Sequence, residues 1–114
     1  MRFQNLPLPD MSKKIGETSW FTELTIPTGL LNKHMAPKGK LGLVIVKEGS
    51  CDFVWEDNPK DVISIDKDHP LVIEPERYHH VIAKKQVVFK VEFYVDSESN
   101  NYDESANRPG QNFI

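Results

Sequence analysis

Short segments rich in β-branched and aromatic residues alternate with turn residues along most of this chain, a pattern that predicts strands. The predicted strands cover residues 30–35, 41–47, 51–55, 62–65, 71–73, 79–83 and 87–95. One face of the last strand carries only apolar residues and should pack in the core: Val87, Phe89, Val91, Phe93 and Val95. No window shows helical periodicity over three turns. The pattern therefore predicts an all-β sandwich or barrel.

Two connections in this pattern affect the rest of the interpretation. Glu48-Gly49-Ser50 predicts a hairpin turn between strands 41–47 and 51–55. Between strands 79–83 and 87–95, a three-residue connection would place His79 inward, beside the apolar face of the last strand. A two-residue connection would shift the register by one and set His79 beside Glu92. The sequence leaves these two alternatives open.

The chain is predicted to form one domain with two appendages, because 114 residues suffice for a single core. Residues 1–16 are interrupted by prolines and weakly patterned, so we expect an N-terminal arm that lies over the domain or is partly loose. Residues 17–95 form the predicted β-barrel domain. Residues 96–114 are rich in Ser, Asn, Asp and Glu and read as a polar C-terminal extension.

Composition narrows the classes of partner. The net charge is −3 without a basic stripe, which argues against nucleic acid. The longest apolar run covers residues 43–46, far short of a membrane span of about 20 residues, and no signal-peptide stretch is evident. A single cysteine, Cys51, excludes an intrachain disulfide framework and fits the cytoplasm. We therefore expect a cytoplasmic protein without a nucleic-acid or membrane partner.

Two histidine-bearing segments, ending at His34 and at His79-His80, are the strongest candidates for a functional site. Imidazole both ligates metals and titrates near neutral pH, and a small β-barrel brings distant segments together. Each histidine alone would be read as a structural residue.

The order of motifs between residues 20 and 95 resembles the cupins, and more closely the N-terminal domains of the tellurite-resistance TehB and YeaR-like family. The motifs that carry the resemblance are Trp20-Phe21, Lys33-His34, Gly39-Lys40-Leu41, the run from Val44 to Gly49, the run from Ile73 to His79, and Val91-Glu92-Phe93-Tyr94. The resemblance implies a cupin-like jelly-roll barrel (a double-stranded β-helix) and a link to tellurite or related oxyanion stress.

The resemblance also implies a reduced metal site. In the wider cupin family a histidine follows a Pro-x-Gly turn; His79 takes this position, with Glu76 in place of the glycine. The first cupin motif normally supplies two histidines and a glutamate before a glycine equivalent to Gly49, and this chain has neither imidazole nor carboxylate there. His34 occupies a position typical of the TehB-like subgroup and would pair with His79 across the barrel mouth.

His34 and His79 are thus predicted ligands of a divalent metal, zinc or similar, but two histidines are too few for a closed zinc site. A third ligand could come from Glu92, from Glu17 or from a bound molecule. A weakly held metal and a metal-free pocket both stay open.

Basic residues around the same region predict an anionic ligand. Lys33 and Lys40 would make the mouth electropositive and favour an oxyanion or carboxylate, with Glu92 as a further lining residue. Arg77 is interpreted as surface charge. Cys51 alternates with Phe53 and Trp55 and is expected to be buried and inert.

We therefore interpret the chain as a binding or sensing module for a small anion or metabolite. It lacks the glycine-rich loop of the methyltransferase domain that full-length TehB proteins resemble, so it should not transfer methyl groups by itself. The alternatives are a metal-dependent oxygenase or isomerase, or a structural domain that acts as a homodimer or in trans with a methyltransferase.

Overall fold

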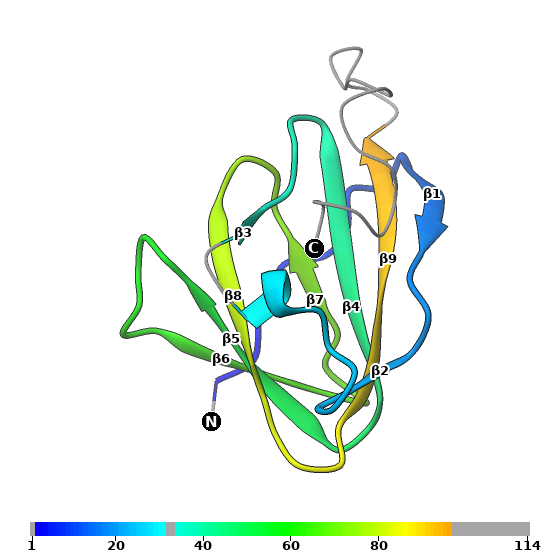
Figure 1. Cartoon of the computed structure of the whole chain (residues 1–114). Coiled ribbons are helices and arrows are strands. Elements are labelled where there is room, and N and C mark those ends of the chain that lie inside the picture. The colour runs from blue at the N-terminus through cyan, green and yellow to red at the C-terminus, as the bar shows by residue number, and fades with distance from the viewer. Residues whose placement is uncertain (1, 32–33, 97–114) are drawn as a thin grey trace.

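The computed structural model describes residues 2–31 and 34–96, apart from the side chains of His34 and Asp96 (Figure 1). The elements in chain order are β1 (Ser12–Glu17), β2 (Phe21–Thr22), the 3₁₀ turn η1 (Thr28–Leu31), β3 (His34–Met35), β4 (Lys40–Glu48), β5 (Ser50–Trp55), β6 (Val62–Asp66), β7 (Leu71–Ile73), β8 (Tyr78–Ala83) and β9 (Val88–Asp96). No helix within the described ranges is long and apolar enough to span a membrane.

Two antiparallel sheets face each other across one core (Figure 1). One sheet has the order β1-β9-β4-β7, with β2 also pairing with β9. The other has the order β3-β8-β5-β6. The sheets are not closed into a barrel. The all-β prediction is therefore confirmed, as an open two-sheet sandwich.

The predicted strands agree with the structure except at the first one. Residues 30–35 divide into η1 and β3, because the N–H of Leu30 donates to the carbonyl of Pro27 (3.0 Å) and closes a 3₁₀ turn. β1 and β2 were not predicted. β1 lies at a sheet edge and exposes most of its residues, so it lacks the apolar alternation that marks a strand with one buried face.

The two predicted hairpins are wrong. The turn at Gly49 joins β4 in one sheet to β5 in the other, and the connection at residues 84–87 likewise joins β8 to β9 across the sandwich. The strands on either side of both connections, β4, β5, β8 and β9, present apolar faces to the same core. Alternation therefore looks the same whether consecutive strands pair or face each other. His79 lies inward, but its cross-strand partners are Trp55 on β5 and His34 on β3.

The core prediction for the last strand is confirmed. Val87, just before β9, and the four inward residues of β9 are buried. Val87, Phe89, Val91 and Phe93 pack in one cluster with residues of the opposite sheet, including Cys51, Phe53 and Trp55. Burying side chains of this kind contributes roughly 1.5–3 kcal/mol each, which makes this layer the main source of stability.

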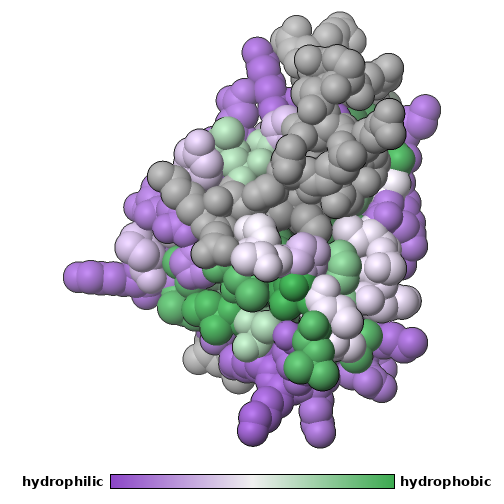
Figure 2. Space-filling model, in the orientation of Figure 1, coloured by the Kyte–Doolittle hydropathy of each residue, from purple (hydrophilic) through white to green (hydrophobic). Residues whose placement is uncertain are grey.

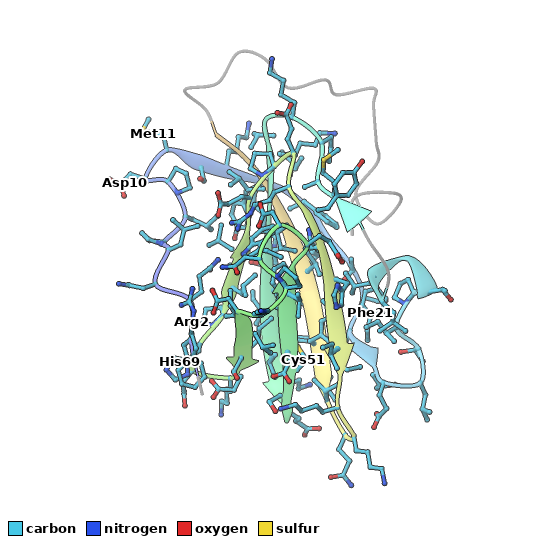
Figure 3. All side chains as sticks on the ribbon, turned by 90° about the vertical axis from the view of Figure 1, so that its left-hand side faces the viewer. Arg2, Asp10, Met11, Phe21, Cys51 and His69 are labelled. Carbon is cyan, nitrogen blue, oxygen red and sulfur yellow. The ribbon has the colours of Figure 1, made fainter. Side chains whose placement is uncertain are left out.

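The N-terminal segment covers the seam between the edge strands β6 and β7. The Ser64 N–H on β6 donates to the carbonyl of Arg2 (2.7 Å). The side-chain amide of Gln4 exchanges two hydrogen bonds with the backbone of Val72 on β7 (2.6 and 2.9 Å). The ring of Phe3 stacks on His69, with centroids 3.6 Å apart. Figure 3 shows Arg2, His69, Asp10 and Met11 along this edge, with Phe21 on the opposite one.

Hydrophobic side chains gather around η1 on the face seen in Figure 1, as the space-filling view in Figure 2 shows. Leu31 of η1 and Ile82 of the neighbouring β8 are both exposed, and we call this pair the η1 patch.

Candidate functional site

Three polar or charged residues are buried among the side chains that the structure describes: Thr18, Lys40 and His79. The Thr18 hydroxyl accepts a hydrogen bond from the N–H of Val91 (3.0 Å) and donates to the carbonyl of Ser19 (2.7 Å), which ties the chain between β1 and β2 to β9. This role is structural. Lys40 and His79 are both basic, and they come from opposing sheets.

His79 is enclosed by aromatic rings near the start of β8. Its imidazole stacks on Phe53, with ring centroids 5.1 Å apart and an interplanar angle of 21°, and meets Trp55 edge-on at 5.6 Å. Its Nδ1 lies 3.2 Å from the carbonyl oxygen of Arg77. A carbonyl only accepts hydrogen bonds, so Nδ1 must carry the proton, and Nε2 of the neutral ring is an acceptor.

Lys40 begins β4 on the inner face of its sheet. It alternates in step with Gly42, Val44 and Val46, all buried, and only 2% of its surface is exposed. Long charged side chains are almost never this buried in proteins, which sets this lysine apart from a solvated surface charge.

Lys40 and His79 lie at the same end of the sandwich. After β3, the carbonyl of Ala36 accepts a hydrogen bond from the N–H of Glu76 (2.8 Å), just before β8. A short turn then leads into β4, with the N–H of Lys40 donating to the carbonyl of Pro37 (3.1 Å). The start of β4, the end of β7 and the start of β8 therefore meet at the upper end of Figure 1.

The structure places the other predicted site residues as follows. The backbone of His34 pairs directly with that of His79 in the β3–β8 ladder. The His34 side chain and the whole of Lys33 lie outside the described residues. No group of three His, Cys, Asp or Glu residues that could hold a metal occurs in the described part of the chain.

Glu92 is not brought to His79. It alternates with the buried residues of β9 and thus lies on the outer face of the sheet, where its carboxylate accepts hydrogen bonds from Lys14 (2.9 Å) and the Tyr94 hydroxyl (2.8 Å). Burial acts to raise the pKa of Glu92, but these two hydrogen bonds and the positive charges of Lys14 and Lys90 together lower it overall. The carboxylate therefore belongs to an outer ion-pair cluster that also includes Glu17.

Arg77 anchors the turn before β8, a role that sequence reasoning missed. Its guanidinium makes two hydrogen bonds to Asp57 (2.7 and 2.8 Å), and its Cζ lies 4.2 Å from the centroid of the Trp55 ring. The hydrogen bond to Asp57 raises the pKa of Arg77. No sequence signal connects these residues, because the contact depends on which strands become neighbours. The clamp fixes the carbonyl that orients His79.

Cys51 is buried, as predicted, and burial is the main reason that its thiol pKa rises from 9.0 to about 12. His80 and His69 are not candidate ligands here: His80 is hydrogen-bonded to Glu56, and His69 to Asp66.

The raised thiol pKa predicts a pH dependence of stability. Well below pH 8.5, the ordinary pKa of a cysteine thiol, the thiol is protonated in both states and contributes no slope. At higher pH it ionises in the unfolded chain but not in the folded one, so the free energy of unfolding falls by up to about 1.4 kcal/mol per pH unit. Urea unfolding between neutral and alkaline pH should show this slope in the difference between wild type and Cys51→Ala. A difference independent of pH would contradict it.

Comparison with known families identifies the family to which this chain belongs. The TehB-like domain family matches residues 17–96, which is most of the chain. This chain belongs to the TehB-like family. No curated protein matches it.

Two solved structures share the fold of this TehB-like chain. A crystal structure of a protein from E. coli (strain K12) aligns with a TM-score of 0.73 at 22% identity, covering 80% of this chain and 97% of that one. TehB from Haemophilus influenzae aligns with a TM-score of 0.71 at 17% identity, covering 82% of this chain but 37% of TehB. At these identities the likeness shows the fold, and this chain corresponds to just over a third of TehB.

Proposed function

We propose that this chain is a binding domain of the tellurite-resistance type, which holds a small anion or an anionic metabolite at the end of the sandwich where β3, β4 and β8 meet. The observation that carries the proposal is the burial of two basic side chains, Lys40 and His79, on the inner faces of opposing sheets. The TehB-like family and the similarity to TehB supply the link to tellurite.

The chemistry of the two residues favours this ligand class. Ammonium and imidazole groups both bind oxyanions and carboxylates through charge-assisted hydrogen bonds. The backbone of His34 pairs with that of His79. We propose His34 and Lys33, the two residues predicted from the sequence, as further members of the site. Glu92 is left out of this proposal, because its carboxylate is engaged on the outer face.

A cupin-like roll is the finer description of the fold that we propose. From β3 onward the chain repeatedly crosses between the two sheets, as strands of a jelly roll do. The two sheets are not closed into a barrel, so we use the description cupin-like roll for the path of the chain. We place the protein in the cytoplasm.

A divalent metal is the alternative occupant. Histidines that bind metals usually donate their second ring N–H to a carbonyl, as His79 does to Arg77. The described residues do not complete such a site, because zinc takes three or four protein ligands and only the two histidine positions are available.

We further propose a non-catalytic role, as a binding or sensing module. We propose a homodimer as the partner, because Leu31 and Ile82 leave apolar surface exposed on the neighbouring elements η1 and β8. An oxygenase or isomerase would need the completed metal centre, and action in trans with a methyltransferase would need a docking partner.

Lys40→Met is expected to weaken anion binding at least about tenfold, since it removes a charge-assisted hydrogen bond but keeps the length of the side chain. Calorimetric titration of tellurite, selenite and small carboxylates into wild type and variant measures this. Lys38→Met, two residues earlier in the same turn, is the matched control and should bind as wild type does. Equal affinity in all three proteins, or no binding in any, would overturn the proposal.

Elemental analysis of untagged wild type and His34→Ala/His79→Ala tests the metal alternative.

A further inference from the structure

The N-terminal segment covers apolar residues on the outer face of the sheet that contains β4 and β7, passing beside the sheets in Figure 3. Leu41 and Val72 point outward, since they alternate with inward residues of these strands, yet only 7% and 3% of their surfaces are exposed. The segment is attached by the hydrogen bonds of Gln4 to Val72 and by the pairing of Ser12 with β9. Between these attachments, residues 5–11 form a strap over the outward-facing residues.

A cavity of about 380 Å³ lies beneath this strap, a volume in the range of small-ligand sites. Leu6 of the strap is 41% exposed although it lines the cavity, so the strap does not fill the space that it covers. The lining side chains are apolar apart from the carboxylate of Glu74, just after β7. The apolar ones include Leu6, Pro7 and Pro9 of the strap and Leu41, Val72 and Pro75 of the sandwich. The cavity therefore suits an apolar molecule with one polar group.

Glu74 is the polar side chain that such a molecule would meet. Its Oε1 accepts a hydrogen bond from Arg77 (3.2 Å), and among the described residues no donor lies on Oε2. A carboxylate accepts hydrogen bonds at both oxygens, and this side chain is 42% exposed. Glu74 can therefore bind a donor of a ligand without giving up Arg77.

The charges around Glu74 favour a cation as that donor. Arg77 also makes two hydrogen bonds to Asp57, so one guanidinium serves two carboxylates. A second cavity of about 400 Å³ shares Glu74 with the first, and there Arg2 pairs with Asp61 one to one. The three carboxylates in these ion pairs thus exceed the two guanidinium groups by one negative charge. An ammonium group would balance this charge, whereas a carboxylate would add to it.

We propose that the cavity binds a small primary amine with an apolar body, whose ammonium group donates to Glu74 and whose carbon chain lies beneath the strap. This site goes beyond the proposed anion site and is separate from it. Leu41 and Val72 face outward, whereas Lys40 and His79 lie on the inner faces of the sheets. Hexylamine is a suitable probe, because an alkylamine is charged at neutral pH, as lysine is. Each further buried methylene should tighten binding about fourfold.

Calorimetric titration at neutral pH and constant ionic strength tests the proposal. We expect hexylamine to bind at least about tenfold more tightly than hexanol, hexanoate or butylamine. Glu74→Gln, which keeps an acceptor for Arg77, should reduce the affinity for hexylamine to that for hexanol. Glu76→Gln is the matched control and should bind as wild type does, because Glu76 is exposed and lines neither cavity.

NMR locates the site without depending on a variant that folds. Hexylamine should shift the methyl resonances of Leu6, Leu41 and Val72. Shifts confined to other methyl groups, the absence of saturable binding, or equal affinity for hexanoate would each overturn the proposal. Unchanged affinity for hexylamine in Glu74→Gln would overturn it as well. The anion titrations with Lys40→Met use other ligands and another residue, so failure of one proposal is distinguishable from failure of the other.

Discussion

Replacing Phe53 with alanine is expected to lower the free energy of unfolding by about 3–5 kcal/mol. Phe53 is fully buried at the centre of the core, where its ring stacks on His79 and packs edge-on against Trp55 at 4.9 Å. Removing the ring leaves a cavity between the sheets, and the strands cannot close over it without moving both neighbours. Urea unfolding followed by tryptophan fluorescence measures the loss, since Trp55 lies at the site of the change.

Leu24→Ala is the matched control, because Leu24 is 90% exposed and its truncation removes apolar surface that stays in water. Its free energy of unfolding should stay within about 0.5 kcal/mol of wild type. A loss below about 1 kcal/mol for Phe53→Ala would mean that the core repacks easily, and that the stacking does not hold His79 in place.

Gly49→Ala is expected to cost more than about 1–2 kcal/mol, although it adds one methyl group. Gly49 has φ +72°, a left-handed conformation that costs residues with a Cβ this much energy. The new Cβ would also lie 2.9 Å from the carbonyl oxygen of Gln86, in the connection between β8 and β9. Thermal or urea unfolding would measure the loss.

Gly29→Ala provides the control at a second glycine. A Cβ at Gly29 meets nothing within 4 Å, so the substitution should change stability by no more than about 0.5–1 kcal/mol in either direction. If Gly49→Ala were as stable as Gly29→Ala, the turn between β4 and β5 would have to adopt a different backbone conformation from the one described here.

The sequence predicted the positions of strands well because apolar alternation is a local signal. Val87 to Val95 shows it over nine residues, and all five inward positions are buried. The sequence could not predict which strands pair, since a face that packs across the sandwich looks like one that packs beside a hairpin partner. Both hairpin predictions failed for this reason, and the alternatives for Glu92 rested on one of them.

The candidate site was predictable only in part. His79 was chosen for its imidazole and supported by the family resemblance, and Lys40 was chosen as a basic residue near the same region. The backbone pairing of His34 with His79 agrees with the idea that the two segments meet. The surroundings of His79 could not be predicted. Phe53 and Trp55 lie up to 26 residues away in the chain, and Arg77 accepts a hydrogen bond through its backbone carbonyl; neither relation leaves a pattern in the sequence. Lys40 is buried because it alternates in step with Val44 on the inner face of β4. The predicted strand began one residue later, at Leu41, so this position of Lys40 was not predicted.

The seam between β6 and β7 bears on how the protein is handled. Unpaired strand edges recruit edges of other molecules and lead to aggregation. Here the carbonyl of Arg2 binds the N–H of Ser64 on β6, and the side chain of Gln4 binds the backbone of Val72 on β7. A purification tag joined to residue 1 would disturb the hydrogen bonds by which Arg2 and Gln4 cover those edges. Poor solubility of such a fusion would then reflect an uncovered edge rather than an unstable core.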